Sequence, residues 1–427
     1  MGGNALWDRK KPSFGFISTR FAGLDGVSLE TQKWADVMRT KGSRVYYMAG
    51  ELDTDPSVSH TAPKAHFKHE EIVRLQEALF KEKVRTPALT TRIWEIKEEL
   101  KAEISKFQAK FDFDILVVQN ALAIPVNIPL GLAIAEFIVE TGVPTIAHHH
   151  DFFWERDRFN TDTAIDYFRT AFPPVHSCIQ HVVINSVAGS DFARFTGSRW
   201  TLIPNVLNFK ELPPVVDDYG RGLKKDIGLD DDTLMVLQPT RIVSRKGIEM
   251  SMELVKNLEP LKAALVISHE AGDEGDDYLT RIKEFADFIQ VPLKIISDRI
   301  GIKRGKNKDG RKLYTLADAY LNSDLVSYPS LYEGYGNAFV EAIYFKKPIV
   351  VNRYSIFAAD IEPKAFDTIT FDGYFTKKKA GEIKALLESS ERIAQMVEKN
   401  YMLGWRYLSY EMLEEKLEQL LINIYGT

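Results

Sequence analysis

Residues 329–342 combine two glutamates with a glycine-rich turn. The segment reads Pro-Ser-Leu-Tyr-Glu-Gly-Tyr-Gly-Asn-Ala-Phe-Val-Glu-Ala, with the glutamates at Glu333 and Glu341. An apolar strand is expected just before it, and a helix over residues 338–345 just after it. A strand-to-helix turn presents backbone N–H groups and the positive end of a helix dipole, which suit an anion or a sugar hydroxyl. Because Glu333 belongs to the loop and Glu341 to the helix, we expect them to bind different parts of one long ligand.

Two cations, Arg241 and Lys246, follow another apolar strand. They lie in segment 238–247, which reads Gln-Pro-Thr-Arg-Ile-Val-Ser-Arg-Lys-Gly. Arg241 offers a planar fork of donors and Lys246 a point charge, and both would neutralise a diphosphate as its bond to a sugar breaks. Taken alone, such residues are more often solvated loop charges, and Arg245 beside them is interpreted in that way.

The run Glu-Gly-Tyr-Gly-Asn, followed after three residues by Glu, resembles the paired-glutamate signature of retaining glycosyltransferases of family 4, which have the GT-B fold. The resemblance implies that Glu333 and the next four backbone amides hold the donor sugar, that Glu341 holds the ribose, and that the two cations bind the diphosphate. The four residues that supply these amides are Gly334, Tyr335, Gly336 and Asn337. In the competing interpretation, Glu333 is a solvated loop carboxylate and Glu341 only complements the helix dipole.

A second glycine loop, residues 23–26, follows the first strand expected in the chain. It reads Gly-Leu-Asp-Gly, and glycines at such a turn let the backbone approach a phosphate or a sugar closely. The resemblance makes Gly26 a donor-site residue, although a simple turn is the alternative. The loop does not spell Gly-x-Gly-x-x-Gly, which weakens the case for a nicotinamide-dependent dehydrogenase.

Three consecutive histidines and an aspartate, residues 148–151, follow an apolar strand. They therefore lie at the carboxyl end of a strand, where open α/β sheets bind ligands. The resemblance aligns His150 and Asp151 with the histidine that approaches the transferred sugar, often through its backbone carbonyl. Metal binding by His148 and His150 is the weaker alternative, because no further His or Cys stands nearby at ligand spacing.

Arg156 and Arg158, just beyond the histidines, are candidates for acceptor binding together with Asp151. Arginine forms bidentate hydrogen bonds with carboxylates and phosphates, so these residues favour an anionic acceptor such as a glycerate or a sugar phosphate. Ordinary surface charge is the alternative. One departure from the family pattern follows residues 348–351, where Asn352-Arg353-Tyr354 replaces the glycine pair of many relatives.

The elements that position these residues follow the same order in both halves of the chain. Strand, loop, helix and strand recur from residue 14 to 147 and again from residue 234 to 296, which is typical of parallel sheets covered by helices. We therefore predict an α/β fold with two doubly wound, Rossmann-like domains facing a cleft. The expected domains are residues 1–212 on the acceptor side and 213–400 for the nucleotide sugar. The resemblance implies that the C-terminal helix, residues 401–427, crosses back to the first domain.

Composition limits the class of protein. A chain of 427 residues with 45% hydrophobic and 27% charged residues is typical of a globular protein with two or three domains. The net charge of −5 argues against a general nucleic-acid binder. The single cysteine and the absence of a long apolar N-terminal stretch favour a cytoplasmic protein with no transmembrane segment. Nothing in the sequence indicates the oligomeric state.

The sequence therefore predicts a retaining hexosyltransferase. It would move a hexose from a nucleotide diphosphate sugar, of the GDP-mannose or UDP-glucose type, to a hydroxyl of a small polar acceptor. A glucosylglycerate-like compatible-solute precursor or a sugar phosphate is the leading acceptor. No cofactor and no metal ion are expected. The alternatives are a sugar-nucleotide epimerase or a phosphorylase of the same fold, and a non-catalytic protein that binds nucleotide sugars.

Overall fold

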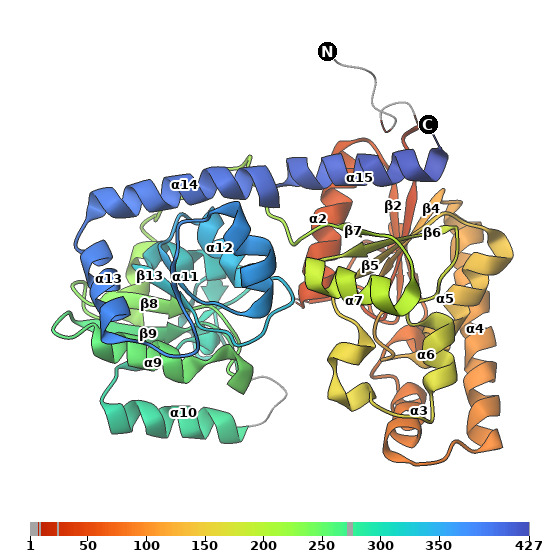
Figure 1. Cartoon of the computed structure of the whole chain (residues 1–427), viewed down its shortest axis with the longest axis horizontal. Coiled ribbons are helices and arrows are strands. Elements are labelled where there is room, and N and C mark those ends of the chain that lie inside the picture. The colour runs from red at the N-terminus through yellow and green to blue at the C-terminus, as the bar shows by residue number, and fades with distance from the viewer. Residues whose placement is uncertain (1–6, 8–9, 24, 271–275, 427) are drawn as a thin grey trace. The chain divides into compact units, whose positions relative to one another are not determined.

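The computed structural model describes residues 7, 10–23, 25–270 and 276–426 (Figure 1). The chain divides into two compact units. Unit 1 comprises residues 1–206 and 410–427, and unit 2 comprises residues 207–409. Each unit contains a parallel sheet flanked by helices, so the predicted α/β architecture with two Rossmann-like domains is confirmed.

The sheet of unit 1 has the strand order β3-β2-β1-β4-β5-β6-β7, and all neighbouring strands are parallel. The strands are β1 (Phe14–Ile17), β2 (Val45–Ala49), β3 (Ser59–Thr61), β4 (Ile115–Gln119), β5 (Thr145–His149), β6 (Ile179–Val183) and β7 (Trp200–Leu202). The chain first adds strands on one side of β1 and then on the other. The direction of growth therefore reverses between β1 and β4, and open α/β sheets bind ligands beyond the carboxyl ends of the strands at such a reversal.

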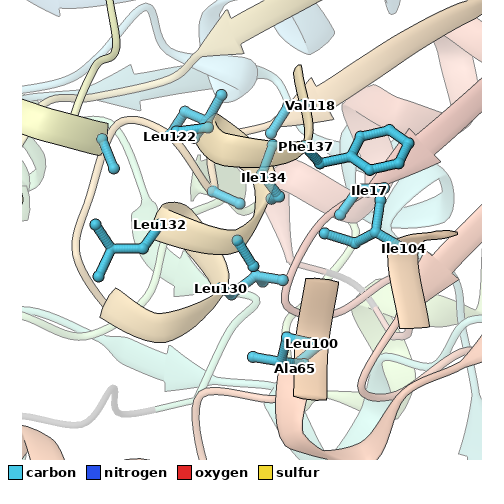
Figure 2. Packing of buried hydrophobic residues seen from close by; sticks show 14 of the residues in the cluster. Ile17, Ala65, Leu100, Ile104, Val118, Leu122, Leu130, Leu132, Ile134 and Phe137 are labelled. Atoms are coloured by element: carbon cyan, nitrogen blue, oxygen red, sulfur yellow. The ribbon is translucent and has the colours of Figure 1, made fainter. Parts of the chain in front are cut away.

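Helices cover both faces of this sheet, as buried parallel strands require. They are α2 (Gly26–Thr40), α3 (Glu70–Lys81), α4 (Pro87–Phe111), α5 (Ile128–Thr141), α6 (Ile165–Ala171) and α7 (Ser186–Thr196). Figure 2 shows one side of the core, where Leu130 and Ile134 of α5 lie near Leu100 and Ile104 of α4. Fully burying one such side chain contributes about 1.5–3 kcal/mol, so this layer holds α4 and α5 against one face of the inner strands β4 and β5.

Unit 2 repeats the pattern with the order β10-β9-β8-β13-β14-β15 and a separate hairpin of β11 and β12. Its strands are β8 (Leu234–Gln238), β9 (Ala263–Ile267), β10 (Leu293–Ile295), β11 (Gly305–Lys306), β12 (Lys312–Leu313), β13 (Leu325–Tyr328), β14 (Ile349–Asn352) and β15 (Ile369–Phe371). Its helices are α8 (Leu223–Asp226), α9 (Ile248–Asn257), α10 (Asp276–Ile289), α11 (Leu316–Asn322), α12 (Asn337–Tyr344), α13 (Lys377–Leu387) and α14 (Ser390–Leu408). Here the reversal lies between β8 and β13, the two strands that precede the predicted diphosphate and sugar loops.

The last helix, α15 (Tyr410–Tyr425), belongs to unit 1 and packs beside α2 (Figure 1). Leu413, Leu417 and Leu421 share a buried cluster with Trp34 and Met38 of α2. The apolar periodicity predicts that residues 382–425 are almost wholly helical, and α13, α14 and α15 confirm this, with an extended residue at Ser409 between the last two helices. At this break the N–H of Leu207 donates to the carbonyl of Leu408 over 2.9 Å.

The expected domain limits fell after residues 212 and 400, whereas the compact units change after residues 206 and 409. The second difference arises because α14 packs on α12 and α13, so the whole of α14 stays in unit 2. Within the described ranges, no helix is long and apolar enough to cross a membrane.

Candidate active site

Two loops at the carboxyl edge of the unit 2 sheet lie against each other. They follow β8 and β13, and they carry Lys246 and Glu333 respectively. The N–H of Leu331 donates to the carbonyl of Arg245 over 2.8 Å. A Cβ atom at Gly247 would lie 2.6 Å from the carbonyl oxygen of Pro329, so only glycine permits this close approach. Residues far apart in the sequence thus meet at the topological reversal of the sheet.

Lys246 and Glu333 form a buried ion pair across these loops, with each side chain only 10% exposed. Burial raises the pKa of Glu333, but the charge and hydrogen bond of Lys246 outweigh it, and the pKa lies below its usual value. Burial lowers the pKa of Lys246, and the nearby Arg245 and Arg241 lower it further against the pull of Glu333. Lys246 therefore keeps the Glu333 carboxylate ionised. Loss of either partner would leave an uncompensated buried charge.

Arg241 lies in the same loop with an exposed side chain. It has no ion-pair partner among the residues that the structure describes. Burial lowers the pKa of His269, two residues after β9, and the charges of Lys246 and Arg241 lower it further. Arg241 and Lys246 are therefore close enough to act on the same imidazole at the carboxyl edge of the sheet. Two neighbouring cations of this kind suit a diphosphate.

The turn before α12 depends on Gly336. This residue has φ +110°, and an added Cβ would lie 2.6 Å from the hydroxyl oxygen of Tyr328 and 3.0 Å from that of Tyr354. The Tyr354 hydroxyl also donates to the carbonyl of Tyr335 over 2.8 Å. Two buried tyrosines thus shape the loop, and the N–H groups in the first turn of α12 begin directly after it.

The ring of Tyr335 points into the protein and is 1% exposed. Burial raises the pKa of its hydroxyl, and the charge of Asp360 raises it further. Tyr335 is one of the four residues, Gly334 to Asn337, whose amides are predicted to bind the donor sugar. In this conformation only its backbone is available for that contact. The sequence prediction concerned these amides and not the ring.

Glu341 lies in the second turn of α12 and is held by a buried tyrosine. The hydroxyl of Tyr320 donates to Glu341 Oε2 over 2.8 Å. Burial raises the pKa of Tyr320 well above its usual value, and the carboxylate raises it further, so the hydroxyl remains a donor. The two glutamates thus have separate supports, Lys246 for Glu333 and Tyr320 for Glu341.

Two of the residues that replace the family's glycine pair, Asn352 and Tyr354, contact the loop that carries Glu333. Asn352 donates from Nδ2 to the carbonyl of Ser330 over 3.0 Å, and its Oδ1 accepts from the N–H of Gly373 over 2.9 Å. Arg353 points elsewhere and pairs with Glu362 over 2.8 Å. Asn352 and Tyr354 therefore act on the loop around Glu333, a role that the sequence did not predict.

In unit 1, the corner after β5 carries His150 and Asp151. Asn120, directly after β4, ties both residues together from a left-handed backbone conformation with φ +59°. Its Oδ1 accepts from the N–H of His150 over 3.0 Å, and its Nδ2 donates to Asp151 Oδ1 over 2.9 Å. This corner stands at the carboxyl edge of the sheet, next to the reversal between β1 and β4.

The histidines alternate in direction along β5. Gln119 Oε1 lies 2.9 Å from His148 Nδ1 and 3.3 Å from His150 Nε2, whereas His149 faces His181 at 3.0 Å. Burial lowers the pKa of His150 to about 4, so its imidazole is neutral at pH 7. His148 and His150 do share a side, as the metal hypothesis supposed. However, the described residues contain no cluster of three metal-ligating side chains.

The two predicted acceptor arginines have different surroundings. Arg156 forms an ion pair with Asp151, whose other oxygen is held by Asn120. Arg158 lies over the ring of Phe159, with 4.6 Å from its guanidinium carbon to the ring centroid. Arg156 therefore belongs to the corner around His150, and Arg158 packs on its neighbour.

Gly26 is exposed at the N-terminus of α2, but a carboxylate already caps this helix. Asp25 Oδ1 accepts from the N–H groups of Val27 and Ser28 over 3.0 and 3.1 Å, and Arg20 donates to its Oδ2 over 2.9 Å. Burial raises the pKa of Asp25, but the bonds from Ser28 and Arg20 hold it below its usual value. An anion at Gly26 would have to share this helix end with Asp25.

Comparisons with known proteins agree with the geometry. The model of the family described as glycosyl transferases group 1 matches residues 305–402. A mannosylglucosylglycerate synthase of Petrotoga mobilis is 30% identical over 386 residues, covering 83% of this chain and 86% of the relative. The enzyme of the same name from Thermotoga maritima is 28% identical, covering 93% and 96%.

Solved structures with similar folds include the Anabaena protein HepE in complex with UDP and glucose, at a TM-score of 0.65 and 13% identity, covering 96% of this chain and 99% of that chain. Sucrose-phosphate synthase of Thermosynechococcus elongatus has a TM-score of 0.65 at 14% identity, with coverage of 97% and 99%. At such identities the likeness concerns the fold alone, and it confirms the predicted GT-B fold class, with two Rossmann-like domains.

Proposed function

We propose a specific reaction for this chain, which belongs to the family of nucleotide-sugar glycosyltransferases that includes the two mannosylglucosylglycerate synthases. In this proposal the enzyme transfers a hexose from a nucleotide diphosphate sugar, of the GDP-mannose or UDP-glucose type, to a hydroxyl of a glucosylglycerate-type acceptor. The anomeric configuration is retained. The observation that carries the proposal is the buried pair of Lys246 and Glu333 beside Arg241, at the reversal of the unit 2 sheet.

The roles proposed for unit 2 follow its charges. Arg241 and Lys246 neutralise the diphosphate as the bond to the sugar breaks, which stabilises the charge that develops in the transition state. Glu333 and the amides of residues 334–337 hold the hexose, and Glu341 holds the ribose. The protein supplies no nucleophile, and it acts by positioning and charge.

The roles proposed for unit 1 concern the hexose and the acceptor. His150, neutral and fixed by Asn120, approaches the transferred sugar, and Gly26 approaches the donor phosphates. Asp151, Arg156 and Arg158 face the acceptor. The fixed corner after β5 supports these assignments because reacting groups must be held within a fraction of an ångström.

The reaction itself is tested by incubating the protein with GDP-mannose or UDP-glucose, with and without glucosylglycerate. The expected result is a glycosylated acceptor with the donor's anomeric configuration, measured by NMR. An isomerised donor in the absence of acceptor would identify an epimerase, and the need for inorganic phosphate would identify a phosphorylase. Tight binding of the nucleotide sugar without any turnover would identify a sensor.

The two glutamates are expected to differ in what they bind. Glu333→Gln should lower transfer at least tenfold, about 1.4 kcal/mol, while the affinity for free nucleoside diphosphate stays within a few fold. Glu341→Gln should weaken nucleotide binding, because its proposed partner is the ribose. Calorimetric titration with GDP and UDP, together with steady-state rates, separates the two effects. Equal losses of nucleotide affinity in both variants would refute this division.

We expect transfer to proceed without a divalent metal ion. In this proposal, Arg241 and Lys246 supply the positive charge that a metal ion supplies to the diphosphate in other transferases. The initial rate should therefore stay within about twofold when the enzyme is dialysed against EDTA and assayed with metal-free donor. Loss of activity that magnesium or manganese restores would contradict this expectation.

The acceptor's carboxylate is expected to depend on Arg156. Arg156→Ala should raise the KM for glucosylglycerate about tenfold, because a charge-assisted hydrogen bond is worth ~1.5–3 kcal/mol. The KM for the neutral analogue glucosylglycerol should change little. Arg158→Ala should have a smaller effect, since this side chain packs on Phe159. An equal loss with both acceptors in Arg156→Ala would assign Arg156 to support of Asp151 instead.

A further inference from the structure

Arg245 contacts the loop after β13 at three points. Its carbonyl accepts from the N–H of Leu331 over 2.8 Å, its Nη1 donates to the carbonyl of Tyr332 over 3.1 Å, and the same Nη1 lies 3.5 Å from Glu333 Oε2. The Arg245 side chain is 38% exposed, whereas those of Lys246 and Glu333 are each 10% exposed. Arg245 therefore reaches the buried carboxylate from the solvent side, at the oxygen that Lys246 does not bind.

Lys246 has one ammonium group for two tasks. It pairs with Glu333 Oε1 in the present conformation, and in the proposed reaction it must also neutralise the donor diphosphate. When the ammonium turns to the diphosphate, Glu333 loses its closest cation. A buried carboxylate without a cationic partner is strongly unfavourable, so Glu333 would move or take up a proton unless a second cation held it.

The other groups around Glu333 cannot supply that charge. Burial raises the pKa values of Tyr328 and Tyr354 well above the usual range, and the carboxylate raises both further, so these hydroxyls stay neutral. The hydroxyl of Ser330, which also lies beside Glu333, is neutral as well. Among the described residues that face Glu333, Arg245 is the cation that remains once Lys246 is engaged.

We propose that Arg245 is a positioning residue, which holds Glu333 in place and ionised while Lys246 is engaged with the donor diphosphate. This inference rests on the proposed function, because it assumes a nucleotide diphosphate sugar as donor. The main ion-pair partner of Glu333 thus changes from Lys246 to Arg245 during the reaction, while the Glu333 carboxylate stays in its position. Arg245 contacts both the Tyr332 carbonyl and the Glu333 carboxylate. In this proposal, the two contacts keep the Glu333 side chain oriented toward the hexose.

Arg245→Ala and Arg245→Lys test the inference in the full-length protein. Arg392→Ala is the matched control. Arg392 lies on α14 in unit 2, is similarly exposed, and forms an ion pair with Asp367 over 2.8 Å. Three quantities are measured for each variant, namely kcat for hexose transfer, the Kd of free GDP or UDP, and the pH dependence of kcat. Thermal unfolding of each variant identifies any loss of the fold.

Arg245→Ala is expected to lower kcat at least tenfold with less than a threefold change in the Kd of the nucleoside diphosphate. The acid limb of its kcat profile should move to higher pH by about half a unit or more, because removal of a nearby cation raises the pKa of Glu333. Arg245→Lys keeps the charge, so it should restore the acid limb and most of kcat. Arg392→Ala should match the unmodified protein.

A tenfold loss of nucleoside diphosphate affinity in Arg245→Ala would overturn the inference, since it would make Arg245 a phosphate ligand. An unmoved acid limb, or a loss of kcat that lysine does not restore, would also overturn it and would leave packing as the role. These outcomes are distinct from failure of the proposed function, in which the unmodified protein itself would bind and turn over no nucleotide sugar.

Discussion

Gly336→Ala is expected to lower hexose transfer at least ~100-fold, which corresponds to about 2.7 kcal/mol of transition-state stabilisation. The added Cβ would lie 2.6 Å from the Tyr328 hydroxyl and 3.0 Å from that of Tyr354, at a backbone φ of +110° that favours glycine. Both tyrosines are buried, and Tyr354 donates to the neighbouring carbonyl of Tyr335. The loop must therefore shift, and it carries Glu333 with it.

Gly310→Ala is the control for this substitution. Gly310, in the turn between β11 and β12, also has a positive φ, +74°, but an added Cβ would meet nothing within 4 Å. It should cost about 1 kcal/mol of stability through backbone strain and leave transfer within a few fold. Rates and thermal unfolding of both variants separate the steric effect from the strain. Transfer by Gly336→Ala at the rate of Gly310→Ala would show that the loop before α12 does not bind the sugar.

The repeating elements of the fold were predictable because the signal is local. The run Leu-Met-Val-Leu-Gln predicts a strand at residues 234–238, and β8 has these same bounds. Runs of this kind are buried on both faces of a parallel sheet, so apolar composition alone identifies them. The break at Ser409 could not be predicted from the sequence. Apolar side chains continue through it at helical spacing, whereas in the structure Ser409 is extended and the chain changes unit directly after it.

The residues that support the candidate site were harder to predict, because their partners are distant in the chain. The segment around Arg245 predicts only a solvated loop charge, since nothing in it indicates the contacts with Tyr332 and Glu333. These contacts exist because β8 and β13 are adjacent in the sheet although about 90 residues separate them. Asn120 was missed in the same way, although an Asn directly after a buried strand is a usable signal for a left-handed, side-chain-bonded corner.

The second large effect is expected at Lys246. Lys246→Met should raise the Kd of the nucleotide sugar about 100-fold, because it removes a phosphate cation and exposes the diphosphate to the charge of Glu333. Removing one partner of a buried pair should also lower the free energy of unfolding by roughly 3 kcal/mol. Arg245 still neutralises part of the Glu333 charge, so the variant should remain folded.

The pH dependence of this variant has a definite sign. Lys246 holds the pKa of Glu333 below its usual value, so the pKa must rise when the ammonium is lost. As the pH falls through that raised pKa, Glu333 takes up a proton and its repulsion of the diphosphate disappears. Nucleotide-sugar binding by Lys246→Met should therefore improve toward acid pH, which calorimetric titration between pH 5 and 8 would detect.

The double variant Lys246→Met with Glu333→Gln decides between two roles of the lysine. Replacing both partners of a buried pair by neutral groups is often close to neutral for stability, so most of the lost unfolding free energy should return. Donor affinity should stay low, because the phosphate cation is still missing. If the double variant instead binds nucleotide sugar as tightly as the unmodified protein, Lys246 serves only to neutralise Glu333. Arg241 would then be the cation that binds the diphosphate.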